Sequence, residues 1–228
     1  MVKKTLGIVV LFILAFSLTA CGDPQVTESD TDPNEDVGPI ANIYLVLVNK
    51  THELPDNWEE VVQIDTVENS LGEKIRIEHK TYEQFELLRD ELLKEGVQIE
   101  LDSVYRTVDE QQELWDDFTV KYGENYVKEY VAVPGFSEHH TGLAVDIFLI
   151  KDGEEIREND SMIADREDFA KVHALLPKYG FILRYPEGRE DVTGYAYEPW
   201  HLRYVNSSRV AEEITKNNLT LEEYLSGN

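Results

Sequence analysis

SEHHTGLAVD at residues 137–146 and EPWH at residues 198–201 are the two most informative segments of this 228-residue chain. A catalytic zinc ion takes three protein ligands and leaves one position for a water molecule, which a nearby base can deprotonate. The candidate ligands are His139, Asp146 and His201, and Glu198 is the candidate base. The two segments therefore predict the metal site of a zinc hydrolase.

The separation of His139 and Asp146 requires the backbone to turn between them if both bind one ion. Seven residues is an odd separation, so one straight strand would place the two side chains on opposite faces. Gly142, between them, is predicted to turn the chain so that both can reach one ion. A strand carboxylate that faces solvent is the alternative for Asp146, whereas His140 is expected to be exposed or to support a ligand.

Glu198 precedes a proline, which disfavours an α-helical conformation at this residue. Glu198 and His201 therefore cannot form part of a helical zinc motif, and on a straight strand they would face opposite ways. A turn or bulge at Pro199 and Trp200 is predicted to bring them together. The alternative is a loop carboxylate in water.

The N-terminal 41 residues are expected to lie outside the folded domain. Lys3 and Lys4 precede an apolar run and then LTAC at residues 18–21, which resembles the lipobox of a bacterial lipoprotein signal. This pattern predicts a signal peptide over residues 1–20 and a lipid on Cys21, the only cysteine of the chain. Residues 21–41 are acidic and poor in apolar side chains, so they predict a disordered tether. Localisation outside the cytoplasm, anchored to the bacterial cell membrane by lipid, follows from this interpretation.

The composition narrows the class of partner. The formal net charge is −25 at pH 7, and nucleic-acid binding needs a basic surface. No nucleic-acid partner is therefore expected, and contact with an anionic membrane is expected only through the lipid. The sequence does not indicate an oligomeric state.

Residues 42–228 have a length that suits one domain. Alternating or apolar runs predict strands over residues 43–48, 74–79, 97–105, 143–150, 181–185 and 200–205. Capping-box patterns predict helices that begin at Thr81 and at Thr107, and further helices are expected over residues 167–176, 208–215 and 220–225. Helices and strands alternate without regular βαβ spacing, so the expected fold class is α+β, with a mainly antiparallel sheet and flanking helices.

The two opening segments also carry a family resemblance. The pattern Ser-x-His-x-x-Gly-x-Ala-x-Asp followed by Glu-x-x-His resembles the VanY-type D-alanyl-D-alanine carboxypeptidases, and SVYRT at residues 103–107 resembles that family's Ser-Gly-Tyr-Arg-Ser. The resemblance covers most of the chain after about Asn42. Val104 and Asn206 stand where the family usually has glycine, which affects local backbone shape and removes no chemical group.

The resemblance implies a fold of the D,D-peptidase and Hedgehog type for residues 42–228. It implies one zinc ion per chain, bound by His139, Asp146 and His201, with Glu198 as general base and acid. Arg106 would stabilise the oxyanion or bind the substrate's terminal carboxylate. Ser137, Gln111 and Trp200 are the candidate substrate-binding residues.

The resemblance further implies an enzyme that removes the C-terminal D-alanine from peptidoglycan stem peptides, with D,D-cleavage of a pentapeptide as the preferred reaction. L,D-cleavage of a tetrapeptide stays open. Two other classes also stay open, namely a wall-binding lipoprotein without turnover and a zinc peptidase that acts on ordinary L-peptides. The presence of Glu198, which a protein without turnover would be expected to lose, favours an enzyme.

Overall fold

Strand β4 (Ala144–Lys151) is the strand to which most of the larger sheet is paired. The structure is a computed structural model, and it describes residues 42–227. Strand β4 pairs with β3 (Gln98–Ser103), with β5 (Glu154–Ile156) and with β7 (His201–Tyr204), and β7 also pairs with β6 (Phe181–Leu183). All these pairings are antiparallel, as are those of a separate two-stranded sheet, β1 (Ile64–Glu68) and β2 (Lys74–Glu78).

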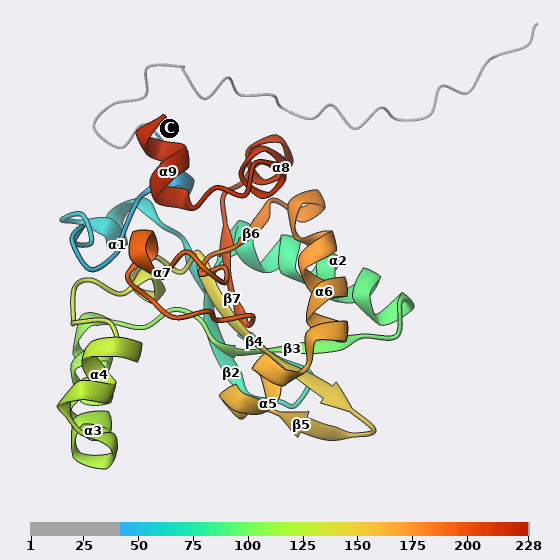
Figure 1. Ribbon diagram of the computed structural model, residues 1–228, viewed down its shortest axis with the longest axis horizontal. Helices are drawn as coiled ribbons and strands as arrows, with labels where there is room; N and C mark the ends of the chain where they lie inside the picture. Colours follow the sequence, from blue (N-terminus) through green and yellow to red (C-terminus); the bar gives the residue numbers. More distant parts are fainter. Residues whose placement is uncertain (1–41, 228) are drawn as a thin grey trace, which may run out of the picture. The chain divides into compact units, whose positions relative to one another are not determined.

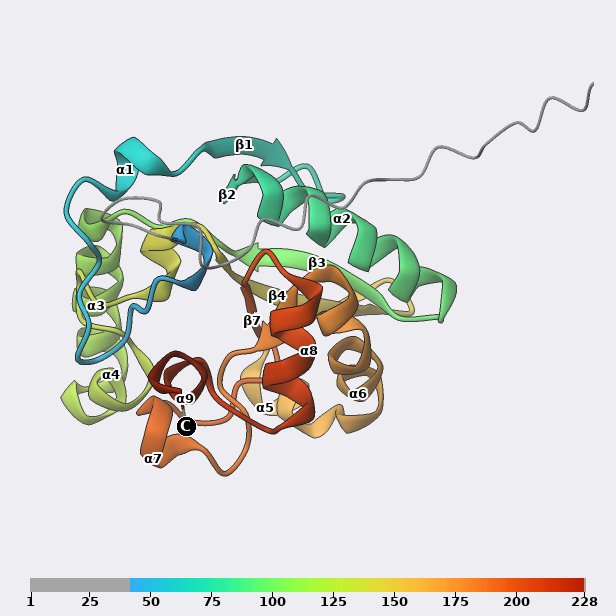
Figure 2. The ribbon, with the colours of Figure 1, turned by 90° about the horizontal axis from the view of Figure 1, so that it is seen from above.

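Helices surround the larger sheet (Figure 1). The α-helices are α1 (Trp58–Val61), α2 (His79–Lys94), α3 (Val108–Tyr122), α4 (Glu124–Tyr130), α5 (Asn159–Ala164), α6 (Arg166–Leu175), α7 (Glu190–Thr193), α8 (Ser208–Lys216) and α9 (Leu221–Ser226). Three 3₁₀ turns accompany them: η1 (Ile43–Leu45), η2 (Glu138–Thr141) and η3 (Leu176–Tyr179). Helices α2, α6 and α8 gather at one end of the sheet, whereas the α3–α4 hairpin lies at the other end (Figures 1 and 2). The predicted α+β class with a mainly antiparallel sheet is confirmed.

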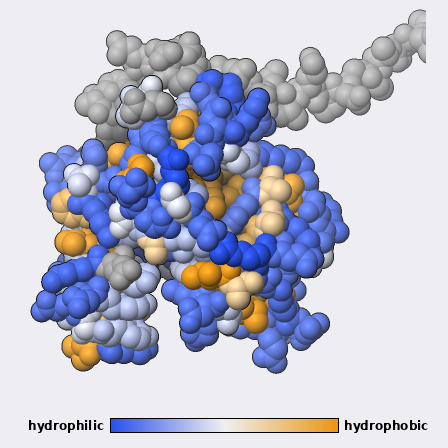
Figure 3. All heavy atoms as spheres, in the orientation of Figure 1, coloured by the Kyte–Doolittle hydropathy of each residue, from blue (hydrophilic) through white to orange (hydrophobic). Residues whose placement is uncertain are grey.

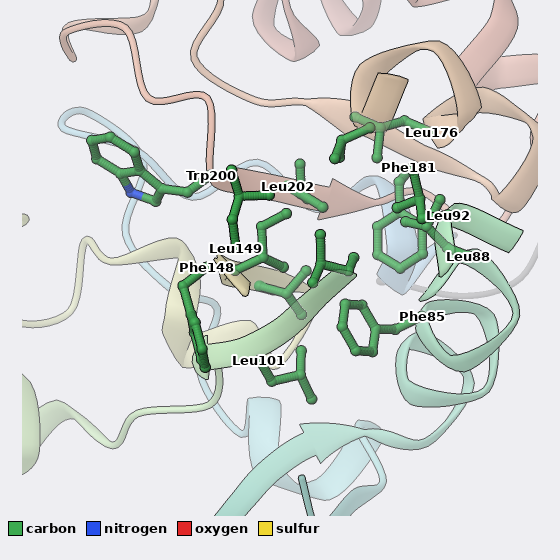
Figure 4. Close-up of a cluster of buried hydrophobic side chains, with 14 of the residues drawn as sticks. Phe85, Leu88, Leu92, Leu101, Phe148, Leu149, Leu176, Phe181, Trp200 and Leu202 are labelled. Atoms are coloured by element: carbon green, nitrogen blue, oxygen red, sulfur yellow. The ribbon is translucent and has the colours of Figure 1, made fainter. Parts of the chain in front are cut away.

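The main core lies between α2, α6 and the sheet. Phe85, Leu88 and Leu92 project from α2 into a cluster that also contains Phe181 and Leu202 (Figure 4). Trp200 lies at the opposite end of this cluster from the α2 side chains (Figure 4). Burial of such side chains contributes about 1.5–3 kcal/mol each relative to exposure, so this cluster fixes the position of the sheet.

Successive side chains of β4 point to opposite faces of the sheet. Val145, Ile147 and Leu149 share one face of the strand and Asp146 and Phe148 share the other, and the hydrophobic core includes apolar residues of both faces. The strand that stabilises the core thus also carries the predicted carboxylate ligand.

One predicted strand is absent, and one predicted helix begins earlier than expected. Residues 43–48 were expected to form a strand, but the segment begins with η1 and belongs to neither described sheet. Arg203 explains why, since its Nη2 donates hydrogen bonds to the carbonyl oxygens of Tyr44 and Val46. Helix α2 begins at His79 rather than at Thr81, because the carboxylate of Glu78 caps it and accepts a hydrogen bond from Thr81 N at 2.7 Å.

The predicted N-terminal features lie outside the described residues. These are the signal peptide over residues 1–20, the lipidated Cys21 and the tether over residues 21–41. Among residues 42–227, no helix combines the length and apolar character that a membrane span requires.

Candidate metal centre and active-site cavity

The register of the larger sheet places Asp146 between two other polar side chains. Asp146 lies opposite His201 of β7 and, after an irregularity that follows Leu101, opposite Ser103 of β3. Directly opposed residues in an antiparallel pair have Cβ atoms about 5 Å apart. Strand pairing alone therefore brings one candidate histidine ligand next to the carboxylate.

The η2 turn supplies the second histidine. His139 lies in this turn, and its backbone carbonyl accepts a hydrogen bond from Arg106 N at 3.2 Å. Trp58 Nε1 donates to Thr141 O at 3.1 Å and anchors the end of the turn. Gly142 then adopts the left-handed conformation, with φ of 73°, and directs the chain into β4. The predicted turn between His139 and Asp146 is confirmed.

We expect Gly142→Ala to destabilise the fold more than an ordinary glycine substitution. An added Cβ would lie 2.6 Å from Ile64 Cδ1 and 3.2 Å from Glu78 N, and this amide is itself bonded to Gly142 O. Gly188→Ala is the matched control, since Gly188 has φ of 77° and open space around it. Left-handed strain alone costs about 1–2 kcal/mol, and overpacking at Gly142 adds about 1–3 kcal/mol. Equal losses in chemical denaturation would show that the close approach is unimportant.

The predicted turn at Pro199 and Trp200 is also confirmed. His201 N donates to Glu198 O at 3.3 Å, and Glu198 N donates to Tyr185 O at 3.2 Å. As a result, Glu198 Oε2 lies 3.7 Å from His201 Nδ1, with only 13% of the Glu198 side chain exposed. Glu198 and His201 therefore face the same centre.

The donor atoms of His139, Asp146 and His201 lie within 4.8 Å of one another. His139 Nε2 is 3.2 Å from Asp146 Oδ2, and His201 Nδ1 is 2.9 Å from Asp146 Oδ1. Asp146 Oδ1 is nevertheless buried without a hydrogen-bond partner. The nitrogen and oxygen lone pairs of these three side chains therefore point to a common centre, where one cation could bind them all. Two imidazoles and one carboxylate form a ligand set that fits zinc.

The charges around this cluster also favour a cation. Burial alone would lower the pKa of His201, but Asp146 and Glu138 outweigh it and raise this pKa to about 10. Burial raises the pKa of Glu198 to about 8, with Asp146 acting in the same direction and His201 opposing it. A carboxyl group with such a pKa can exchange protons near neutral pH.

A cavity of about 250 Å³ opens over the cluster. All the predicted site residues of the described chain line it: Arg106, Gln111, Ser137, His139, Asp146, Glu198, Trp200 and His201. The face seen in Figure 3 is mostly hydrophilic and is hollowed between the α3–α4 hairpin and the α5 region. The predicted residues thus meet in one place, while their individual roles stay predictions.

Arg106 is held in the cavity by two neighbours. Its guanidinium donates to Gln111 Oε1 at 2.5 Å and to Ser103 Oγ at 2.7 Å. Gln111 Nε2 in turn donates to Ala132 O at 2.7 Å. The Gln111 amide therefore supports Arg106, and its predicted contact with substrate stays untested.

Sequence reasoning missed several residues of the site. Tyr185 and Tyr195 line the cavity, with ring centroids 4.7 Å apart, and nothing in their local sequence distinguishes them from core aromatics. His140, which was expected either to be exposed or to support a ligand, is buried, with its Nδ1 2.7 Å from Arg106 O and its Nε2 accepting a hydrogen bond from Gly135 N. Glu138 is the most consequential omission and is treated below.

Comparison with known proteins supports the same family as the sequence motifs. The family model for VanY, described as D-alanyl-D-alanine carboxypeptidase, matches residues 74–207. The chain is 44% identical over 184 residues to the protein YodJ of Bacillus subtilis (strain 168). This match covers 79% of the chain and 66% of YodJ, so the chain spans slightly less than two thirds of that relative.

Two solved structures share the fold. The LD-carboxypeptidase LdcB has 42% identity and a TM-score of 0.67, with 79% of this chain and 84% of that chain covered. A mutant of the vancomycin-resistance D,D-pentapeptidase VanY, in complex with Zn(II), has 32% identity and a TM-score of 0.66. The match to VanY covers 81% of this chain and 99% of that chain.

Proposed function

Because the chain belongs to the VanY family of D-alanyl-D-alanine carboxypeptidases, we propose that it is a zinc-dependent carboxypeptidase of peptidoglycan stem peptides. One observation carries the proposal. His139, Asp146 and His201 converge in the cavity where Glu198 and Arg106 also lie. A binding protein without turnover would need no proton-accepting carboxylate at that point.

The metal and the side chains of the protein have different roles in the proposed hydrolysis. Zinc, when bound by His139, Asp146 and His201, supplies a Lewis acid and lowers the pKa of water to about 7. Glu198 accepts a proton from the attacking water and delivers it to the amine that leaves. Its position beside His201, largely shielded from solvent, suits both transfers.

Arg106 provides the positive charge that a carboxypeptidase needs for its substrate's free carboxylate. Ser103 and Gln111 hold the guanidinium in place, and Arg106 lines the cavity. A planar guanidinium binds a carboxylate through two parallel hydrogen bonds. We therefore assign Arg106 to the terminal carboxylate, with the oxyanion as the alternative.

We expect Arg106→Lys to raise KM more than it lowers kcat. Loss of the two-point contact costs about 1.5–3 kcal/mol, which is about 10- to 100-fold in kcat/KM. Arg76→Lys is the control, because Arg76 pairs with Glu110 and does not line the cavity. Steady-state kinetics on a stem peptide gives the answer. A fall in kcat with unchanged KM would assign Arg106 to the oxyanion instead.

Removal of the last D-alanine from a pentapeptide remains the preferred reaction. L,D-cleavage of a tetrapeptide is the second candidate, favoured by the 42% identity to LdcB against 32% to VanY. Mass spectrometry of both stem peptides, incubated with and without a chelator, separates the two. Chelator-sensitive loss of alanine from one substrate identifies the bond. Cleavage of L-peptides only, or of nothing despite bound metal, would refute the proposal.

We also propose that Cys21 carries a lipid and that residues 21–41 hold the catalytic domain outside the membrane. The lipobox-like LTAC sequence and the acidic, apolar-poor stretch support this. Cys21→Ala should move the protein from the detergent phase to the aqueous phase of a detergent partition. Unchanged partition would exclude the anchor.

A further inference from the structure

Glu138, next to the ligand His139, is one of the most deeply buried carboxylates of the described chain. Only 1% of its side chain is exposed. Its Oε1 accepts hydrogen bonds from Arg184 Nε at 2.8 Å and from Arg203 Nη1 at 2.6 Å, and both arginine side chains are completely buried. Its other oxygen, Oε2, lies 3.3 Å from His201 Nε2.

His201 therefore has a different carboxylate on each side of its ring. Nδ1 faces Asp146 and Glu198, at 2.9 Å and 3.7 Å, whereas Nε2 faces Glu138. A neutral imidazole carries its proton on one nitrogen only, and the other nitrogen is free to bind a metal. An ionised carboxylate can only accept a hydrogen bond, so Glu138 keeps the proton on Nε2.

His139 shows the complementary arrangement. Its Nδ1 lies 2.7 Å from Val104 O and its Nε2 faces Asp146 at 3.2 Å. The two histidines thus turn different nitrogens towards the cluster, each with its outer nitrogen next to an acceptor. The acceptor is a neutral carbonyl for His139 and a charged carboxylate for His201, and a carboxylate makes the ligand more basic.

We propose that Glu138 is a positioning residue of the metal centre, which orients His201 with Nδ1 towards the metal. The proposal rests on the metal centre proposed above. Arg184 and Arg203 fix Glu138 in turn, because both bind Oε1 and leave Oε2 to His201. Arg184 is held by Glu222 of α9, and Arg203 by the carbonyls of Tyr44 and Val46.

The competing role for Glu138 is to neutralise two buried arginines and nothing more. Glu222 provides the comparison, since it also pairs with Arg184 but forms no hydrogen bond or ion pair with His201 among the described residues. A purely structural role predicts that variants of Glu138 and Glu222 affect metal binding alike. A positioning role predicts that only Glu138 variants do.

The first test needs no substitution. Long-range ¹H–¹⁵N spectra of the zinc-loaded chain report which ring nitrogen of each histidine carries a proton. We expect a protonated Nε2 in His201 and a protonated Nδ1 in His139. A protonated Nδ1 in His201 would overturn the proposal.

The second test compares Zn²⁺ affinity by chelator competition. Glu138→Gln keeps the reach of the side chain and loses its charge, whereas Glu138→Asp keeps the charge and loses the reach. Each should weaken Zn²⁺ binding by about 10- to 100-fold. Glu222→Gln should lower Tm and leave the affinity unchanged.

The outcomes separate this proposal from the metal centre itself. If the parent chain binds Zn²⁺ tightly and both Glu138 variants bind it equally well, only the proposed role of Glu138 is overturned and the metal centre stands. Failure of the parent chain to bind Zn²⁺ would overturn both the metal centre and this role. If the Glu138 variants do not fold, a protonated Nδ1 in His201 in the spectra of the parent chain would still overturn the proposal.

Discussion

Glu198→Gln is expected to lower kcat by about 100- to 10,000-fold, the usual contribution of a general acid–base group. Glutamine keeps the size of the side chain and cannot accept the proton. The change leaves the three predicted ligands in place, and Glu198 Oε2 lies 3.7 Å from His201 Nδ1. Metal content should therefore remain at one ion per chain.

The measurement combines turnover of a stem peptide with metal analysis of the same sample. Glu187→Gln is the matched control, because Glu187 is exposed, pairs with Arg166 and does not line the cavity. Near-normal turnover in Glu198→Gln would show that another group is the base. Loss of metal would show that Glu198 is a ligand.

Asp146→Asn is expected to abolish metal binding together with activity. Each carboxylate oxygen of Asp146 faces one histidine, at 3.2 Å and 2.9 Å, so the negative charge lies at the middle of the donor set. The histidines outweigh the effect of burial and hold the pKa of Asp146 well below its usual value, so the group is ionised. An uncharged amide cannot replace it.

Loss of this ligand should weaken Zn²⁺ binding by more than the roughly 10- to 100-fold expected for an outer partner. Asp102→Asn is the control, since Asp102 lines the same cavity but pairs with Arg157. Chelator competition and metal stoichiometry check the prediction. Retention of one tightly bound ion by Asp146→Asn would remove this residue from the ligand set.

The candidate site could be predicted because its chemistry is concentrated in short segments. The separation of His139 and Asp146 demanded a turn, and Gly142 provides it in the left-handed conformation. Pro199 excluded a helix between Glu198 and His201, and the observed turn follows. Local sequence was sufficient in both cases because the constraint acts within a few residues.

The role of Glu138 could not be predicted in this way. Its arginine partners lie 46 and 65 residues further along the chain, and one sequence contains no signal for such pairings. The same cause explains the missing strand over residues 43–48. That segment has a strand-like apolar pattern, but Arg203, a residue about 160 positions away, donates hydrogen bonds to two of its carbonyl oxygens.

The contacts of Arg184 and Arg203 have a consequence for the order of folding. Synthesis proceeds from the N-terminus, so residues 44–46 and Glu138 exist long before Arg203. Contacts across such separations form late, because the intervening loop must first be closed. The centre around His201 should therefore mature last, after Arg203 has bonded to the carbonyls of Tyr44 and Val46, and a nascent chain should remain unable to retain metal until then.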